Sequence, residues 1–378
     1  MAAEGAILLE EAQARGFLAA WAPVALPEEI KARFRAWVQA GRHGGMAYLA
    51  QTLEVRLDPT LRFPARSALL LAAPHAFPEP GKPPGGLRLG RVARYAWVRD
   101  YHLLLEPHLK ALEEVARGLG LWARGYVDHG PLSERSLAPL AGLGFIGKSG
   151  MLIRVGLGSH LSLAALLTDL PPPPAAPSPN RCGRCTRCLT FCPTGALLGD
   201  STLDARLCVS YWTIEHKGAI PYPLWDGVGE WLFGCDLCQE VCPWNRFGSV
   251  WAGFRPEPDL AHPSLLDFFL LSGRAFRRKY AGTVFLRPGR ARMARNALIV
   301  AANLRAGLGL VRLGLKDPHP LVRLTALQAA FRVGRLEWAR GLLSDPEPRV
   351  ALEALRLWRG EPPSSVDLFQ DGGEAPGP

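Results

Sequence analysis

Long apolar segments are missing from this 378-residue chain. The longest apolar runs, residues 68–73 and 161–167, are far shorter than the roughly 20 residues of a membrane-spanning helix. The chain also lacks a recognisable export signal and the dense disulfide pattern of small secreted domains. With 48% hydrophobic and 21% charged residues, its composition is that of a globular protein. These features predict a cytoplasmic protein that does not bind a membrane.

Cysteine is absent outside residues 182–242, and the eight cysteines there follow a fixed spacing. The run from Cys182 to Pro193 reads C-x-x-C-x-x-C-x-x-x-C-P, and the run from Cys235 to Pro243 gives the second half of the same pattern. In bacterial two-cluster ferredoxins, three cysteines of such a run hold one [4Fe–4S] cluster and the fourth binds the other cluster. Zinc sites rarely use three cysteines at this spacing. We therefore expect two [4Fe–4S] clusters in a ferredoxin-like domain at residues 181–250.

The same rule predicts the ligands of each cluster. The first cluster is expected to be bound by Cys182, Cys185, Cys188 and Cys242. The second is expected to be bound by Cys192, Cys208, Cys235 and Cys238. Cys208 completes the second set because Leu232 stands where a regular second motif carries a cysteine. Clusters that share a motif in this way lie about 12 Å apart, a separation that suits electron relay.

The net charge of +10 is concentrated toward one end of the chain. Residues 274–359 contain 16 Arg and 2 Lys against 5 acidic residues, a net charge of +13. Such a basic region favours a polyanionic partner, most simply a nucleic acid. The alternative is a solvated helix surface on which arginine is used in place of lysine.

Apolar runs and helical periodicities alternate over residues 1–170, which predicts a mixed α/β or α+β domain. Residues up to about 50 are expected to form helices, one of which ends at Gly41. A further helix is expected at residues 100–121. Strands are expected at residues 66–74, 122–127 and 161–167.

The second half of the chain changes character. A proline-rich segment at residues 171–180 predicts a stiff linker. Within residues 251–360, Asp317-Pro-His-Pro and Asp345-Pro-Glu-Pro each precede an Ala/Leu-rich helical pattern, 28 residues apart. A repeat of this length is typical of short HEAT-like helical hairpins, which present an extended surface. Residues 361–378 are rich in Pro and Gly and are expected to be disordered.

Asp128 is the best candidate for an acid in the first domain. It follows the strand predicted at residues 122–127 and precedes the turn His129-Gly-Pro. A carboxyl group in such a position can lie in a partly desolvated pocket, where its pKa rises toward the range of a proton donor. The alternative is an ordinary turn aspartate. We expect His129 to be a turn residue rather than a metal ligand.

Several of these motifs occur in one order along the chain and carry a family resemblance. They are Glu54-Val-Arg56-Leu-Asp-Pro, Asp100-Tyr-His, Tyr126-Val-Asp128-His-Gly-Pro, Gly144-Phe-Ile-Gly-Lys-Ser, Cys192-Pro-Thr-Gly-Ala, Cys208-Val-Ser210-Tyr and Gly234-Cys235-Asp236-Leu-Cys238-Gln-Glu-Val-Cys242-Pro-Trp-Asn. With them the chain resembles the epoxyqueuosine reductases. These cobalamin- and iron–sulfur-dependent enzymes complete queuosine in tRNA and are similar to reductive dehalogenases.

The resemblance implies a nitroreductase-like cobalamin-binding domain at residues 1–170, the ferredoxin-like domain, and HEAT-like repeats that bind tRNA. It implies that epoxyqueuosine at the wobble position of tRNA anticodons is reduced to queuosine. In this reaction an epoxide becomes an alkene with two electrons and two protons, through cob(I)alamin supplied by the two clusters. Asp128 is implied as the proton donor. The residues implied at the cobalamin are Arg56, Asp100, Asp128, Leu152, Ser210, Cys235 and Asp236.

The D-x-H-x-x-G box that supplies a histidine to cobalt in other enzymes is absent, which fits the base-off cobalamin of this family. His129 and Ser149 depart from the Thr and Asn that the family often has. The implied partners are tRNA that carries epoxyqueuosine in its anticodon loop and an external low-potential electron donor of the flavodoxin or ferredoxin type. The chain is expected to be a monomer.

Two other functions are compatible with the residues. A cobalamin-dependent reductive dehalogenase acting on a small molecule would share the first two domains but would give the basic repeats no role. A non-enzymatic iron–sulfur protein that binds nucleic acid would need neither cobalamin nor an acid at Asp128. Cobalt content therefore distinguishes this last function from the reductase.

Overall fold

The computed structural model describes residues 3–172 and 177–365. The described residues form two compact units, the first within residues 1–78, 98–206 and 236–256 and the second within residues 79–97, 207–235 and 257–378. The predicted linker lies partly, and the predicted disordered tail mainly, outside the described residues. The division into sequence domains stays a prediction. Within the described residues, no helix is both long enough and apolar enough to cross a membrane.

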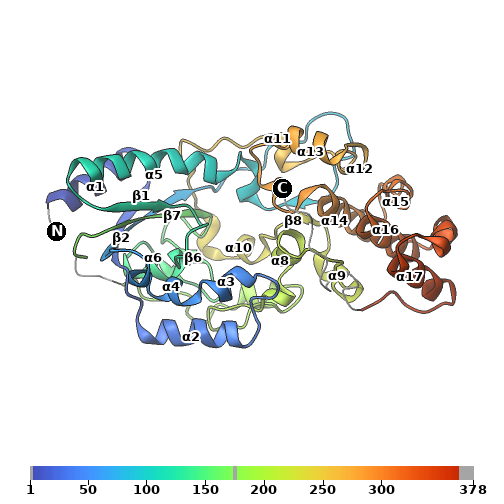
Figure 1. Cartoon of the computed structure of the whole chain (residues 1–378), viewed down its shortest axis with the longest axis horizontal. Coiled ribbons are helices and arrows are strands. Elements are labelled where there is room, and N and C mark those ends of the chain that lie inside the picture. Colours follow the sequence, from blue (N-terminus) through green and yellow to red (C-terminus); the bar gives the residue numbers. More distant parts are fainter. Residues whose placement is uncertain (1–2, 173–176, 366–378) are drawn as a thin grey trace. The chain divides into compact units, whose positions relative to one another are not determined.

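The first unit is built on a four-stranded antiparallel sheet with the order β1-β2-β7-β4. Its strands are β1 (Leu18–Pro23), β2 (Ser67–Pro74), β4 (Ala123–Tyr126) and β7 (Leu161–Thr168). Helices α1 (Ala3–Ala14) and α5 (Tyr101–Gly118) cover one face, and α6 (Glu134–Leu140) packs on the other (Figure 1). Because both faces are covered, every residue of β2 is buried, which explains its uninterrupted apolar sequence.

The strands predicted at residues 66–74, 122–127 and 161–167 are confirmed as β2, β4 and β7. The expectation of helices throughout the first 50 residues is wrong at Leu18–Pro23, which forms the edge strand β1. Its alanine-rich sequence carries no strong strand preference, so pairing with β2 decides its conformation. The helix expected to end at Gly41 is α2 (Glu28–Gln39), and Gly41 adopts a positive φ of 66° just beyond it.

Short elements complete the first unit. They are α3 (Ala47–Gln51), α4 (Leu53–Leu57), β5 (Phe145–Ile146), β6 (Leu152–Ile153), α7 (Arg187–Phe191) and α10 (Leu237–Glu240), with single 3-10 turns at Pro59–Leu61 and Pro243–Arg246. A further 3-10 turn, Ala205–Leu207, contains the point in the sequence where the first unit ends and the second continues. β5 and β6 form a small antiparallel hairpin.

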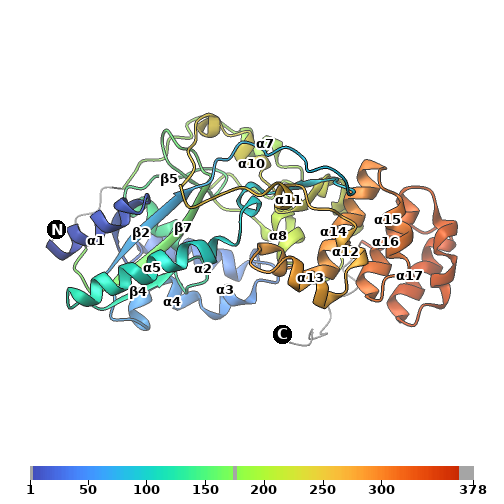
Figure 2. The ribbon, with the colours of Figure 1, turned by 90° about the horizontal axis from the view of Figure 1, so that it is seen from above.

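The second unit is mainly helical. Its two short strands, β3 (Arg91–Val92) and β8 (Trp231–Phe233), pair in parallel. Its helices are α8 (Val209–Ile214), α9 (Trp225–Val228), α11 (Pro258–Ala261), α12 (Asp267–Leu270), α13 (Gly273–Lys279), α14 (Gly289–Leu304), α15 (Gly309–Gly314), α16 (Pro320–Arg332) and α17 (Pro348–Trp358), with 3-10 helices at Arg94–Trp97, Tyr222–Leu224, Val284–Leu286 and Leu336–Ser344. Figures 1 and 2 show α14, α16 and α17 stacked one after another.

An ion pair of the same kind joins each helix of this stack to the start of the next. The guanidinium of Arg290 on α14 donates two bonds of 2.8 Å to Asp317, just before α16. Arg323 on α16 donates two bonds of 2.7 Å to Asp345, just before α17. Both carboxylates also accept a backbone N–H two residues later. The D-P-x-P repeat is therefore a structural repeat, while its HEAT-like classification stays a prediction.

The centre of the second unit contains a fully buried cation. Arg295 on α14 donates to the carbonyls of Trp212, His216 and Gly218, at 2.7, 3.0 and 2.5 Å. The neighbouring Asn296 donates to the carbonyls of Thr213 and Leu232. These bonds fix α8 and the loop after it, the segment that follows Cys208.

Candidate cluster-binding and acid–base sites

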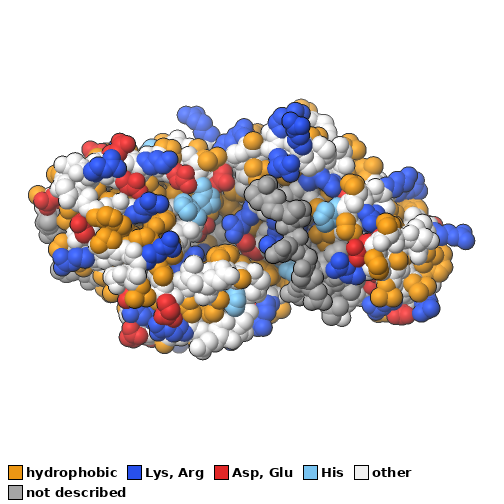
Figure 3. Space-filling model, viewed as in Figure 1, with side chains coloured by type: hydrophobic (Ala, Val, Ile, Leu, Met, Phe, Trp, Pro, Cys, Tyr) orange, Lys and Arg blue, Asp and Glu red, His pale blue; other side chains and the backbone are white. Residues whose placement is uncertain are grey.

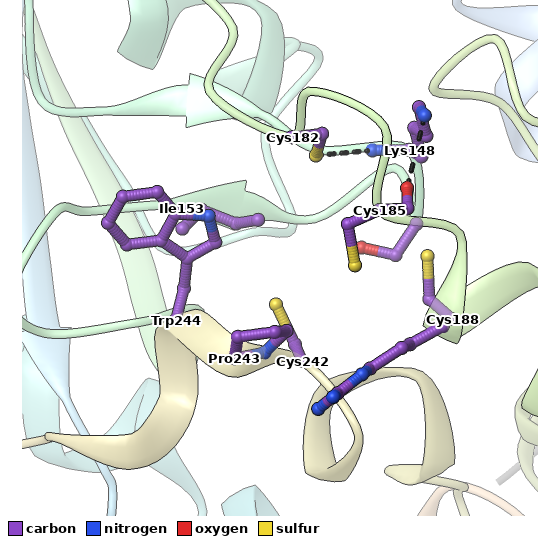
Figure 4. Close-up of a pocket in the computed structure, with 10 residues that line it drawn as sticks. Lys148, Ile153, Cys182, Cys185, Cys188, Cys242, Pro243 and Trp244 are labelled. Atoms are coloured by element: carbon purple, nitrogen blue, oxygen red, sulfur yellow. Dashed lines mark hydrogen bonds between the residues drawn. The ribbon is translucent and has the colours of Figure 1, made fainter.

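Four cysteines, three from one run and one from a distant part of the sequence, line one cavity of the first unit. They are Cys182, Cys185, Cys188 and Cys242. Figure 4 shows their sulfur atoms directed into the space between them. The cavity has a volume of about 40 Å³, several times what one water molecule needs. These are the four residues that the motif predicts for the first cluster.

The cavity fits a [4Fe–4S] cluster in its chemistry. The Lys148 amide donates to the Cys182 sulfur over 3.4 Å, a bond that favours a thiolate. Lys148 Nζ donates to the carbonyls of Gly183 and Cys185, which fixes the ligand loop. Burial and the neighbouring cysteines raise the pKa of the Cys188 and Cys242 thiols. These two thiols therefore need a nearby bound cation to ionise together.

A glycine allows the backbone to approach this cavity closely. A Cβ atom at Gly147 would lie 2.5 Å from Cδ1 of Ile153, a lining residue, and 3.5 Å from the Cys182 sulfur. The remaining lining residues, Ser149, Arg187, Pro243 and Trp244, close the sides. Ser149 therefore faces the predicted cluster, a role that the sequence did not assign.

The ligand set of the second cluster stays a prediction. Cys192 and Cys238 belong to the first unit, and Cys208 and Cys235 belong to the second. The sulfur of Cys192 accepts the Ala196 N–H over 3.3 Å, so this residue resembles Cys182 in having a backbone donor at sulfur.

Asp128 lies on the turn that follows β4, as predicted. Its φ is +59°, a left-handed conformation that is uncommon for residues other than glycine and is concentrated at functional sites. Tyr101, the first residue of α5, donates its hydroxyl to Asp128 Oδ2 over 2.6 Å. The expectation of a desolvated carboxyl is wrong for the described chain, because the turn projects Asp128 outward and leaves it exposed.

His129 acts as a turn residue. Its Nδ1 lies 2.7 Å from the Val127 carbonyl, and its backbone N–H donates to the same oxygen. The next residue, Gly130, packs so tightly that a Cβ atom there would lie 2.5 Å from the ring of Tyr126. The Asp128 turn is therefore supported on both sides by the end of β4.

Glu134 is the buried carboxylic acid of this region, and the sequence interpretation overlooked it. Its side chain is 8% exposed, and Oε1 has no hydrogen-bond partner among the described residues. Burial and the nearby Asp128 raise the pKa of Glu134 to about 8. The sequence offered one signal, an acidic residue four positions after Gly130 at the start of an apolar helix. The same pattern is equally typical of a solvated acid in the first turn of a helix.

The other residues expected at a cobalamin have partners of their own. Arg56 donates to the Leu132 carbonyl and the Thr52 hydroxyl, at 2.7 and 2.8 Å. Asp100 caps α5 by accepting the His102 N–H, and its Oδ1 also lies 2.7 Å from His102 Nδ1. Their polar groups could still face a corrin, so the residues present are compatible with the group.

Leu152 and Asp236 are buried. The Leu152 side chain belongs to the apolar core, so only its backbone could contact a cofactor. Asp236 accepts a bond of 2.9 Å from Gln239. Ser210 and Cys235 belong to the second unit, and their place at the cofactor stays a prediction.

Comparison with known proteins agrees with this chemistry. Residues 181–245 match the family model described as a 4Fe-4S double cluster binding domain. The chain is thus an iron–sulfur protein of the double-cluster type on a mixed α/β fold. Residues 56–129 match the family model described as "Epoxyqueuosine reductase QueG, DUF1730".

Similarity to individual proteins extends over most of the chain. It is 39% identical to the epoxyqueuosine reductase of Salmonella typhimurium, over 76% of this chain and 77% of the relative. It is 38% identical to the Escherichia coli (strain K12) enzyme, over 73% of this chain and 74% of the relative. The chain belongs to the epoxyqueuosine reductase family.

Solved structures of the family superpose closely. An epoxyqueuosine reductase crystallised with an epoxyqueuosine-modified tRNA-Tyr stem loop gives a TM-score of 0.83 at 29% identity, covering 93% of this chain and 97% of that one. The Streptococcus thermophilus enzyme gives a TM-score of 0.82 at 29% identity, covering 94% of this chain and 99% of that one. An epoxyqueuosine reductase structure from Bacillus subtilis gives a TM-score of 0.82. Its catalytic aspartate loop is swung out of the active site.

Proposed function

We propose that this chain reduces epoxyqueuosine to queuosine in tRNA, with Asp128 as the acid that protonates the departing oxygen. The observation that carries the proposal is the similarity to a reductase solved with an epoxyqueuosine-modified tRNA stem loop, over 93% of this chain. The four-cysteine cavity and the Tyr101–Asp128 pair supply the redox and acid–base groups that the reaction requires. The basic second unit adds a surface for an anionic substrate.

The cysteines bring electrons to the site. Cys182, Cys185, Cys188 and Cys242 would hold one [4Fe–4S] cluster, and Cys192, Cys208, Cys235 and Cys238 the other. An external one-electron carrier of the flavodoxin or ferredoxin type would reduce them. Cobalamin, when bound in its base-off form near Arg56, Asp100, Asp128 and Asp236, supplies a strongly reducing cobalt centre. Ser210, Cys235 and Asp236 would contact it partly through their backbone, and Leu152 through its backbone alone.

Asp128 is suited to deliver a proton to an oxygen atom. The Tyr101 hydroxyl occupies Oδ2, and among the described residues no donor is bound to Oδ1. A proton on Oδ1 can therefore face a substrate while Tyr101 fixes the carboxyl plane. A Bacillus subtilis relative has its catalytic aspartate loop swung out of the active site, and a similar movement of the turn at Asp128 would bring this acid toward or away from the substrate.

The tRNA must present its modified base to the site. A base in an anticodon loop is extruded at a cost of about a few kcal/mol, less than a base inside a duplex. Basic side chains of the second unit would hold the phosphates and set this orientation. Since tRNA is the substrate, we also propose that the protein works in the cytoplasm, and we expect a monomer.

The test is anaerobic reconstitution followed by turnover. We expect about eight iron atoms and one cobalt per chain, and formation of queuosine in tRNA, detected by mass spectrometry of the nucleosides. The Asp128→Asn variant should keep both metals but react at least about 100-fold more slowly, because it cannot donate the proton.

The matched control is Glu114→Gln, which removes one negative charge from an exposed position on α5. It should react like the wild type. A fully active Asp128→Asn variant would exclude this acid. Iron without any cobalamin uptake would instead favour an iron–sulfur protein that binds nucleic acid.

A further inference from the structure

Three exposed arginines accompany the ligand loop of the first cluster. Arg181, Arg184 and Arg187 each stand directly before one of its cysteines in the sequence. All three are exposed, and their side chains have no ion pair or hydrogen bond with another described residue. Because neighbouring Cα atoms are about 3.8 Å apart, each guanidinium is attached beside a predicted cluster ligand.

Cys242, the fourth ligand predicted for this cluster, brings a segment of the same character. It precedes the 3-10 turn Pro243–Arg246. Arg246 at the end of this turn is exposed and has no ion pair with a described residue. Phe247, which follows it, is 73% exposed, and Phe191 at the end of α7 is 57% exposed. Each ligand segment therefore combines free cations with an exposed aromatic ring.

We call these two segments, residues 181–191 and 240–247, the cluster surface. They contain 4 Arg and 1 acidic residue, Glu240, a net charge of +3. Within the first unit, α7 packs against α10, and the cysteines of both segments converge on one cavity. The cluster surface is therefore a cationic region that surrounds the ligands of a single cluster.

Hydrogen bonds hold the longer segment in place. Asn180 donates to the Ile146 carbonyl and accepts the Cys182 N–H, each over 2.8 Å. Lys148 Nζ donates to two carbonyls of the loop, at 2.9 and 3.0 Å. Both tethers come from the hairpin of β5 and β6 and the turn within it. A loop fixed in this way loses little conformational entropy when a partner binds its side chains.

The location of these charges indicates what they bind. An external one-electron carrier must place its redox group close to a cluster, because electron transfer slows steeply with distance. A cationic surface attracts an acidic carrier and accelerates encounter, and a small contact with a few exposed aromatic rings suits a transient redox complex. A tRNA is also anionic, but it has no redox group and gains nothing from lying over the cluster ligands.

We propose that the cluster surface binds an acidic one-electron carrier protein and that electrons enter the chain at the first cluster. This inference rests on the proposed function, which requires such a carrier. In each transfer the reduced carrier loses one electron and the first cluster gains it, and no bond forms or breaks. Two transfers supply the two electrons that convert the epoxide to the alkene.

The experiment measures cluster reduction in the iron-loaded, cobalamin-free full-length protein, so it does not depend on turnover. Fully reduced flavodoxin is the probe, and stopped-flow absorbance gives the second-order rate constant. The variant carries Arg181→Gln, Arg184→Gln and Arg246→Gln, and it keeps Arg187, which lines the cavity. Its rate constant should fall about 10- to 100-fold at low salt, the range over which charge steers association. The wild-type rate constant should decrease with ionic strength, and that of the variant should not.

Two controls separate docking from damage to the cluster. Photoreduced 5-deazariboflavin, which is small and uncharged, should reduce the variant and the wild type at equal rates. A second triple variant, Arg62→Gln with Lys110→Gln and Arg117→Gln, removes the same charge from exposed positions outside the cluster surface and should react with flavodoxin like the wild type. Equal flavodoxin rates in the two triple variants would overturn the proposal, as would a first variant slowed alike by both reductants.

A footprint on the wild type requires no variant. Oxidised flavodoxin should slow amide hydrogen exchange in residues 181–191 and 240–247, and an epoxyqueuosine-containing stem loop should not. Absence of protection by flavodoxin would overturn the proposal, and protection by the stem loop instead would assign the surface to tRNA. Normal cluster reduction by flavodoxin without queuosine formation by the cobalamin-loaded enzyme would refute the proposed function and leave the docking surface in place.

Discussion

At the scale of single residues, the two carboxyl groups of the acid–base site lie in different environments. Asp128 is exposed on a left-handed turn and bonded to Tyr101, whereas Glu134 is buried among apolar strands. The exposed group can reach a substrate, and the buried group can retain a proton. Two neighbouring carboxyl groups with different environments are a common basis for assigning acid and base roles.

This environment gives Glu134 a measurable effect on stability. Its pKa is about 8 in the folded chain against 4.5 as the reference, so folding takes up a proton between these values. The wild type should therefore lose stability relative to Glu134→Gln as the pH rises from 4.5 to 8, by at most about 1.4 kcal/mol per pH unit. Below and above this window the difference should be constant.

Urea unfolding of the cobalamin-free protein at several pH values measures this difference. Glu114→Gln, at an exposed site on helix α5 across the sheet, serves as control and should show no such trend. A difference between wild type and Glu134→Gln that does not change with pH would show that Glu134 ionises normally in the fold.

At the scale of elements, the second unit uses arginine as internal structure. Arg290 and Arg323 join successive helices through paired bonds to Asp317 and Asp345, whose side chains are each 2% exposed. Arg295 is completely buried and bonded to three carbonyls. A planar guanidinium is suited to these paired bonds because it has several fixed donors. Part of the basic charge therefore stabilises the helices and does not face a partner.

Breaking one of these pairs should loosen the last helix. Asp345→Asn keeps the shape but removes the charge opposite Arg323, leaving a largely buried cation without its counter-ion. We expect a loss of about 1–3 kcal/mol, seen as faster amide hydrogen exchange in α17. Glu337→Gln, an exposed acid on the preceding 3-10 helix, is the control and should leave the exchange unchanged. Unaltered protection of α17 in Asp345→Asn would show that the pair is energetically neutral.

At the scale of the whole molecule, only some cations of the basic region remain available to a polyanion. Figure 3 shows separate Lys and Arg side chains, with exposed apolar ones between them, over the C-terminal helices. On α13, Arg274, Arg277 and Arg278 are exposed, and no ion pair engages them among the described residues. These three are better candidates for binding phosphates than the arginines of the helix stack.

Replacing all three of these arginines by glutamine should weaken tRNA binding. The slope of log Kd against log salt concentration should decrease by about 0.7–0.9 for each phosphate that the variant no longer neutralises, as measured by fluorescence anisotropy. The control replaces three exposed arginines of the first unit, Arg33, Arg62 and Arg117, and changes the net charge equally. If both triple variants lose affinity alike, net charge rather than a defined surface would hold the tRNA.

The sequence by itself determined the iron–sulfur chemistry, because cluster ligands are named by residue type and spacing that do not depend on the fold. It also located the strands β2, whose apolar run is uninterrupted, and β7, which is apolar except for Ser162 and Thr168, and the turn that carries Asp128. Local patterns of this kind are written in adjacent residues, so they can be read from the chain before it folds.

Only the tertiary structure decided which groups are buried and which are free. It made Leu18–Pro23 a strand by pairing it with β2, and it bonded Arg290, Arg295 and Arg323 inside the second unit. It also exposed Asp128 and buried Glu134 without a partner for Oε1 among the described residues. Burial and pairing depend on packing between residues far apart in the chain. Desolvation, which sets the proton affinity of a carboxyl group, is a property of that packing and not of the local sequence.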